Sequence, residues 1–190
     1  MGCSNPHPHG QIWAQNTIPV EPAKEQENQL KYLTSHNTSL LLDYLQIEII
    51  RKERIVYENG GFVVLVPFWA VWPYETMIIP KRKVHHILQL TNNEIKQFAD
   101  IIKVITVKYD NLFSISFPYS SGIHQAPTDG REHEEWQMHM HFYPPLLRSA
   151  TIKKFMVGYE LLANPQRDIT AETSASILHD LSTVHFSNSK

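Results

Sequence analysis

The sequence predicts an α+β fold in which a mostly antiparallel sheet is flanked by helices. Apolar runs at 55–57 and 62–66 are separated by an Asn-Gly-Gly turn, a pattern typical of a β-hairpin. Residues 136–143 alternate polar with apolar side chains, as a strand with two different faces does. Between these segments, Thr91 and Glu94 match the capping box that begins a helix. Short strands together with capped helices predict this class.

The N-terminal part of the chain is expected to be extended first and helical afterwards. Prolines near the start push each preceding residue toward extended geometry. A serine before a leucine run is a typical N-cap. The expected elements are an extended segment at 1–14, a polar helix from Glu21 or Pro22 to about Tyr32, a break at 34–38 and a helix over 40–50 capped by Ser39.

The remaining elements follow from periodicity and turn residues. The helix that begins after Thr91 carries an apolar stripe at helical spacing. The members of this stripe are Ile95, Phe98, Ile101, Ile102 and Ile105. Further strands are expected at 76–79, where Pro80 ends the strand, and at 112–117, 136–143 and 150–155, with closing helices at 157–163 and 170–181.

Composition excludes several classes of protein. The chain has 190 residues, is 42% hydrophobic and 19% charged, and carries a net charge of -2, so it can bury a core. No basic excess suggests nucleic-acid binding, and no apolar run is long enough to span a membrane. The single cysteine, Cys3, rules out an internal disulfide framework and favours a reducing compartment. We therefore expect a soluble, cytoplasmic protein without nucleic-acid or membrane partners.

The most informative compositional fact is the presence of 11 histidines, some of them in H-x-H pairs. Residues two apart in a strand share a face, so His139 and His141 should project together. Paired imidazoles of this kind suit a metal, and His124 with a carboxylate could complete the site. Nitrogen and oxygen donors favour zinc or non-haem iron. The alternative is a pair of half-exposed histidines on a polar sheet face.

The other pair, His7 and His9, lies in the segment P-H-P-H-G-Q. The prolines stiffen this segment and remove backbone donors, which makes it a rigid presenter of side chains. A preorganised imidazole suits nucleophilic or general-base catalysis, and the Gln11 amide could donate to a developing charge. The alternative is a structural turn. The two H-x-H segments also resemble each other, which suggests an internal duplication.

Weaker signals point to a phosphorylated ligand. Lys153 and Lys154 precede Gly158, so a cation and a close backbone approach are both available to a phosphate. A lysine pair is also common on a solvated edge. The remaining histidines show no partner pattern and are expected on the surface; they are His85, His86, His133, His179 and His185.

With these residues assembled, the chain resembles the galactose-1-phosphate uridylyltransferase family. The resemblance spans nearly the whole chain and rests on long, specific segments. These are GCSNPHPHGQIW at 2–13, VPFWAVWPYET at 66–76, KYDNLF at 108–113, FPYS at 117–120, WQMHMHFYPPLLRSAT at 136–151 and KFMVGYE at 154–160.

The resemblance implies a histidine-triad-like fold built from two related halves, and a ping-pong reaction. UDP-glucose and galactose 1-phosphate exchange UMP and give glucose 1-phosphate and UDP-galactose. The resemblance makes His9 the nucleophile that carries the uridylyl group, and it places Gln11 on the phosphoryl oxygens. Hydrolytic histidine-triad relatives carry histidine at the position of Gln11, which argues against a nucleotide hydrolase.

The resemblance also implies two metals and a set of substrate contacts. His7 corresponds to a zinc ligand, and a second metal, iron or zinc, corresponds to Glu25, His124, His139 and His141. The implied substrate contacts are Gly2, Cys3, Ser4, Gln11, Lys154, Phe155, Tyr159, Glu160 and Gln166.

One departure from the family pattern affects these expectations. The H-P-H motif normally follows a whole half that supplies the other zinc ligands, so the zinc site is incomplete here and the chain is expected to be a fragment. Residues 1–34 would be the end of the N-terminal half and 35–190 the C-terminal half. Full-length members are expected to be homodimers. The alternative function is an inactive module stabilised by the second metal.

Overall fold

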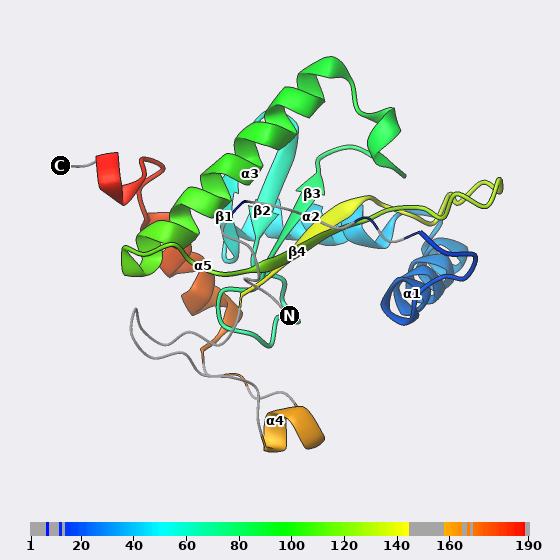
Figure 1. The fold of residues 1–190 in the computed structure, drawn as a ribbon. Coiled ribbons are helices and arrows are strands. Elements are labelled where there is room, and N and C mark those ends of the chain that lie inside the picture. Colours follow the sequence, from blue (N-terminus) through cyan, green and yellow to red (C-terminus); the bar gives the residue numbers. More distant parts are fainter. Residues whose placement is uncertain are drawn as a thin grey trace.

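The fold was analysed in a computed structural model, which describes residues 7, 12, 14–144, 158–164, 167 and 169–188. Its centre is a five-stranded sheet with strand order β1-β2-β3-β5-β4, in which every neighbouring pair is antiparallel (Figure 1). The strands are β1 (Ile55–Glu58), β2 (Phe62–Leu65), β3 (Thr76–Pro80), β4 (Ser120–His124) and β5 (His139–Tyr143). The α+β class with an antiparallel sheet is thereby confirmed.

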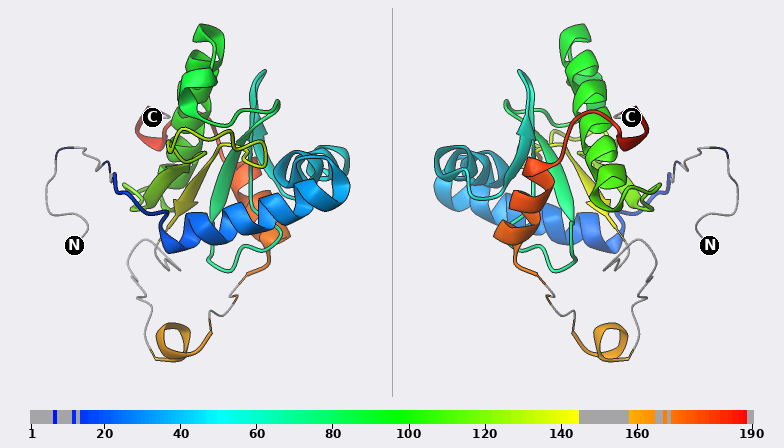
Figure 2. Two further views of the ribbon diagram at one scale, coloured as in Figure 1. Left: turned by 90° about the vertical axis from the view of Figure 1, so that its right-hand side faces the viewer. Right: turned by 90° about the vertical axis from the view of Figure 1, so that its left-hand side faces the viewer.

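The helices cover both faces of this sheet. The α-helices are α1 (Val20–His36), α2 (Leu40–Arg51), α3 (Asn92–Phe113), α4 (Tyr159–Leu162) and α5 (Ala171–Asp180), and short 3₁₀ turns lie at Ile87–Gln89 and Phe186–Asn188. Figure 2 shows α2 and α3 on opposite sides of the sheet. No helix in the described ranges is both long and apolar enough to cross a bilayer.

Alternation along the strands gives each face its own apolar cluster. On one face, Val64 and Ile78 pack with Ile101 of α3 and Leu178 of α5. On the other face, β2 and β3 residues pack against Leu41 and Leu45 of α2, and these strand residues are Val63, Leu65, Met77 and Ile79. Because both faces are covered, β2 and β3 are buried along their whole length.

Local sequence signals explain several boundaries. The Asn59 side-chain oxygen accepts hydrogen bonds from the backbone of Gly61 and Phe62, which fixes the predicted hairpin turn. Thr91 and Glu94 form the expected capping box at the start of α3. Ser39 is the N-cap position of α2, as predicted, without a side-chain cap hydrogen bond.

The strand expected at 112–117 is wrong, because α3 continues through Phe113 and ends at Ser114 in a left-handed conformation. Phe117, which follows the helix, packs back against it: its ring stacks on that of Tyr109 in α3 at a ring-centroid distance of 5.3 Å. The strand of this region is β4, which begins three residues later. The stripe of α3 is otherwise as predicted, except that Ile95 is 51% exposed.

The first helix is longer than predicted, since α1 extends into the expected break as far as His36, and Asn37 ends it in a left-handed conformation. The predicted strand at 136–143 is shorter, with the paired part beginning at His139. The helices predicted at 40–50 and 170–181 are confirmed as α2 and α5. The strand expected at 150–155 lies outside the described residues.

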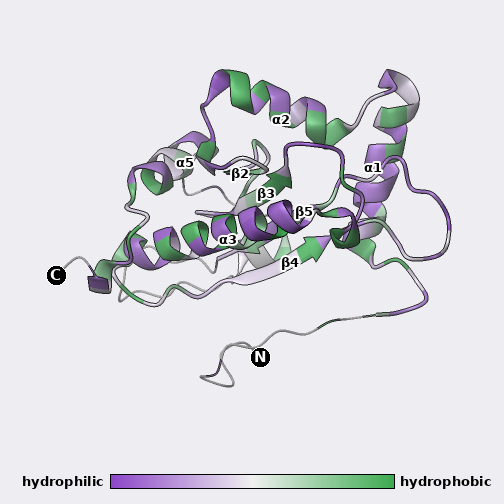
Figure 3. Cartoon of the chain, turned by 90° about the horizontal axis from the view of Figure 1, so that it is seen from above, coloured by the Kyte–Doolittle hydropathy of each residue, from purple (hydrophilic) through white to green (hydrophobic). Residues whose placement is uncertain are grey.

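Helix α1 differs from the other long helices because its inward face is polar. Glu25 and Gln26 are half-buried, and Gln29, three to four residues later, is the one fully buried residue of the helix. The remaining half-buried residues are Pro22, Tyr32 and Leu33. Figure 3 shows mostly hydrophilic residues along α1, whereas α3 alternates between hydrophilic and hydrophobic residues. A helix of this kind is held by hydrogen bonds and charges rather than by an apolar stripe.

Candidate metal centre

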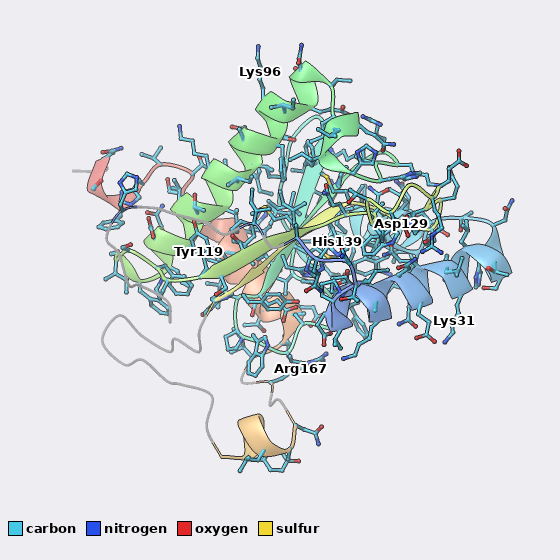
Figure 4. The ribbon with its side chains drawn as sticks, turned by 45° about the vertical axis from the view of Figure 1, so that its right-hand side comes forward. Lys31, Lys96, Tyr119, Asp129, His139 and Arg167 are labelled. Atoms are coloured by element: carbon cyan, nitrogen blue, oxygen red, sulfur yellow. The ribbon has the colours of Figure 1, made fainter. Side chains whose placement is uncertain are left out.

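Four side chains from three elements meet between α1 and the sheet. Glu25 comes from α1, His124 from β4, and His139 and His141 from β5, and their nearest donor atoms all lie within 4.8 Å of one another. Figure 4 shows His139 beside the N-terminal half of α1, with Lys31 further along the same helix. Among the described residues, this is the group of histidine and acidic side chains that could hold a metal ion.

Sheet register explains why the three histidines converge. In the β4–β5 ladder, His124 is directly opposite His139, and Gly122 is opposite His141. Alternation puts His139 and His141 on one face, the side that Met77 of β3 also occupies. The ring centroids of His139 and His141 are 4.8 Å apart. The predicted shared orientation of this pair is therefore confirmed.

The carboxylate of Glu25 lies at the centre of these rings. Both of its oxygens lie 2.9 Å from Nδ1 of His124, and single oxygens lie 3.4 Å from Nε2 of His139 and from Nε2 of His141. Burial by itself would raise the pKa of Glu25, but the contacts with the three histidines outweigh it and hold the pKa far below its usual range. Glu25 is therefore an anion in this site.

His139 and His141 are more buried than the alternative interpretation, a pair of half-exposed histidines on a polar sheet face, predicts. His139 is 2% exposed and His141 is 5% exposed, so they are not half-exposed histidines on a polar face. The polar face of α1 covers them. Burial lowers the pKa of His141, which favours the neutral imidazole that a metal needs.

Neighbouring hydrogen bonds fix the tautomer of His139. Its Nδ1–H donates to the backbone carbonyl of Gln137 at 2.8 Å, because a carbonyl can only accept. The other ring nitrogen, Nε2, therefore faces Glu25 and would be the atom that coordinates a bound metal ion. Such second-shell contacts orient metal-bound histidines in proteins.

Gln137 is itself held on several sides. Its backbone N–H donates to Oε1 of Gln29 on α1 at 3.0 Å, and its side chain bonds the backbone of Val84 and Arg82. Gln137 is fully buried and Gln29 is 2% exposed. The helix that supplies Glu25 thus also fixes, four residues later, the backbone that orients His139.

A second polar cluster joins α1 to the loop between β4 and β5. His133 lies 2.9 Å from both Glu135 and Asp129, and Gln26 donates to Glu135 at 3.2 Å. Burial alone would lower the pKa of His133, but the two carboxylates outweigh it and raise the pKa. The expectation that His133 is a surface residue is wrong, because it is 6% exposed.

Of the other histidines expected on the surface, His179 is exposed, whereas His85, His86 and His185 are half-buried. The sequence reasoning also missed Gln26 and Gln29. Their signal was their spacing from Glu25, which places all three on one face of the predicted helix.

The predicted substrate and nucleophile residues mostly fall outside the described residues. These are Gly2, Cys3, Ser4, His9, Gln11, Lys154, Phe155 and Gln166. Tyr159 and Glu160 lie in α4, and Tyr159 is 55% exposed. His7 is exposed, and in the described part of the chain it belongs to no metal-binding group of three or more side chains.

Comparisons with known proteins agree on one family. The family described as galactose-1-phosphate uridyl transferase, C-terminal domain, matches residues 25–190, and its N-terminal domain matches residues 1–19. Galactose-1-phosphate uridylyltransferase of Haemophilus influenzae is 54% identical over 186 residues, which cover 98% of this chain and 53% of that protein. The enzyme of Rattus norvegicus is 50% identical over 189 residues, which cover 98% and 50%.

Solved structures give the same result. A uridylyltransferase structure aligns with a TM-score of 0.84 and 28% identity, covering 94% of this chain and 55% of that one. An ADP-glucose phosphorylase from Arabidopsis thaliana shares the fold, with a TM-score of 0.73, 19% identity and coverage of 88% and 50%. The chain spans about half the length of the curated relatives it matches. It belongs to the galactose-1-phosphate uridyl transferase family, and most of it corresponds to the C-terminal domain of that family.

Proposed function

We propose that the protein takes part in uridylyl transfer between UDP-glucose and galactose 1-phosphate. The observation that carries this proposal is identity of 50–55% to galactose-1-phosphate uridylyltransferases across 98% of the chain, for example in Haemophilus, Kluyveromyces and Rattus. The H-P-H-G-Q segment at 7–11 lies within that alignment. The exchange of UDP-glucose and galactose 1-phosphate for glucose 1-phosphate and UDP-galactose is the reaction that we propose.

His9 is the proposed nucleophile. Its ring nitrogen attacks the α-phosphorus of UDP-glucose, a P–N bond forms, and the bond from phosphorus to the bridging oxygen breaks. Glucose 1-phosphate leaves with that oxygen. A phosphate oxygen of galactose 1-phosphate then attacks the same phosphorus, the P–N bond breaks, and His9 is restored. Gln11 donates to the phosphoryl oxygens, where negative charge accumulates.

The proposed substrate contacts are Gly2, Cys3, Ser4, Gln11, Lys154, Phe155, Tyr159, Glu160 and Gln166. Of these, Tyr159 and Glu160 belong to α4. Lys154 would supply a point charge for a phosphate. His7 would contribute one ligand to a zinc site. The division into 1–34 and 35–190, the cytoplasmic location and the homodimer of the full-length protein belong to the same proposal.

Glu25, His124, His139 and His141 are the proposed ligands of a divalent iron or zinc ion. The chemistry of the donors fits: three imidazoles and one carboxylate, with Nε2 of His139 directed toward Glu25. When bound, the ion would cross-link α1 to β4 and β5. The role of these residues is therefore structural, and no step at phosphorus passes through them.

The test of transfer is the intact mass of the purified chain after mixing with UDP-glucose. Quenching at alkaline pH preserves an acid-labile P–N bond. We expect a gain of one uridylyl group, its absence in His9→Ala, and its retention in His179→Ala, which changes an exposed histidine. No adduct in any form of the chain would refute activity of this chain and favour the second candidate, an inactive module stabilised by the metal centre.

A further inference from the structure

A cavity of about 450 Å³ lies beside the candidate metal centre, between α1, α2 and the sheet. Glu25, His139 and His141 form part of its wall, whereas His124 does not. Three of the four ligand side chains thus border one continuous space. A cavity of this volume is large enough for a small organic molecule.

The wall opposite α1 is apolar: Leu40 and Leu41 of α2, Met77 of β3 and Trp69 from the turn between β2 and β3 line it. The α1 side is polar and includes Glu21, Lys24 and Asn28 as well as Glu25 and Gln29. Trp69 is 44% exposed and its ring packs against Tyr44 at a centroid distance of 4.8 Å, so it forms part of the rim. An apolar wall opposite a polar one suits an amphipathic ligand.

One buried polar atom of this wall lacks a hydrogen-bond partner among the described residues. It is Nε2 of Gln29. The other amide atom of Gln29, its Oε1, already accepts from Gln137. An unsatisfied buried donor is costly, so an acceptor atom placed next to the Gln29 amide would be stabilised.

Charge favours an anion in this space. A divalent metal with one carboxylate and three neutral imidazoles leaves a net positive charge at the site. Glu21 and Lys24, the other charged residues of the cavity wall, pair with each other at 2.8 Å, so their charges cancel. An anionic head group bound to the metal would neutralise the remaining charge.

We propose that this cavity binds a small organic carboxylate, whose head group ligates the metal and whose apolar body packs against Leu40, Met77 and Trp69. The inference rests on the proposed metal centre but not on uridylyl transfer. It adds a ligand site to a centre whose protein ligands otherwise have a structural role.

The test uses the full chain loaded with Co²⁺, whose visible ligand-field bands report coordination. Acetate and benzoate share a head group and differ in their apolar body. Both should change the cobalt spectrum, and benzoate should bind roughly tenfold more tightly because it buries apolar surface.

Variants of the wall then locate the ligand. Trp69→Ala opens the rim and Leu40→Trp fills the cavity, so each should weaken benzoate binding roughly tenfold and leave acetate binding nearly unchanged. Phe68→Ala is the matched control, since Phe68 neighbours Trp69, is 59% exposed and does not line the cavity. If Leu40→Trp does not fold, Trp69→Ala on the exposed turn still tests whether benzoate binds in this cavity.

The outcomes separate the two proposals. If the chain gives no cobalt spectrum, the proposed metal centre and this ligand site are both refuted. A cobalt spectrum that neither anion changes would overturn the ligand site alone. Equal benzoate affinity in the wild type, Trp69→Ala and Leu40→Trp would show that anions reach the metal elsewhere, and would also overturn it. Any of these results leaves the adduct experiment on His9 unaffected.

Discussion

Removal of the metal should loosen α1 from the sheet and leave the rest of the fold in place. The inward face of α1 is polar at its centre, at Glu25, Gln26 and Gln29, and no apolar residue of the helix is fully buried, so little hydrophobic burial holds it. Both apolar clusters are built from other elements. The attachment of α1 therefore depends on polar contacts, and those of Glu25 pass through the metal centre.

The expected magnitude follows from linkage. A metal present at a hundred times its Kd adds about 2.7 kcal/mol to the free energy of unfolding. In a domain of this size each kcal/mol changes Tm by about 2–4 °C. Chelation should therefore lower Tm by about 5–11 °C. The destabilisation should be largest in α1.

Calorimetry with and without chelator measures the shift, and hydrogen exchange of the amides of residues 20–36 locates it. Glu25→Gln keeps the size of the side chain and removes its charge, so its Tm should be nearly independent of chelator. Glu27→Gln is the matched control, because Glu27 is exposed on the same helix and pairs with Lys31. A full chelator effect in Glu25→Gln, or equal exchange in α1 with and without metal, would refute the reasoning.

Three further predictions concern the polar contacts around the core. Gln29→Leu leaves the buried N–H of Gln137 unsatisfied, and should cost about 1–3 kcal/mol of stability and roughly tenfold or more in Co²⁺ affinity, measured by urea unfolding and metal titration. The contribution of His133 should be largest below about pH 6.5 and should fall as pH rises through its raised pKa, so the stability difference between wild type and His133→Gln should shrink in alkaline buffer. A difference that grows with pH would contradict the assigned sign. Lys108→Met should lose about 1.5–3 kcal/mol in urea unfolding, because the buried Nζ donates to the carbonyls of Leu178, His179 and Leu181 at the end of α5.

The sequence predicted most of the fold because local signals and tertiary packing agree there. The Asn59 turn and the Thr91 capping box have mechanisms that act within a few residues. The error at 112–117 arose where an apolar run fits both a strand and a helix end. Tertiary contacts determine which structure forms. The chain leaves α3 after Phe113, and Phe117 then folds back to stack on Tyr109 of the same helix.

The candidate site was predictable in part for the same reason. The pair His139 and His141 share a face through the two-residue period of a strand, which the sequence alone reveals. Glu25 is 99 residues from His124, and no local pattern joins them. The resemblance to the family supplied that carboxylate. The buried role of His133 was missed because its partners combine a loop with α1.

The position of the metal centre suggests why a structural site would matter to an enzyme of this family. The match to the N-terminal domain ends at residue 19 and the match to the C-terminal domain begins at residue 25, so α1 starts where one domain gives way to the other. Glu25 and Gln29 fix that helix to the sheet through the ligand cluster and through Gln137. Because α1 directly follows the segment that contains His9, fixing its first turns restricts the positions that this segment can reach. Under the proposed function, a rigid attachment at this point would preorganise His9 as the nucleophile, and a bound ion would take no part at phosphorus.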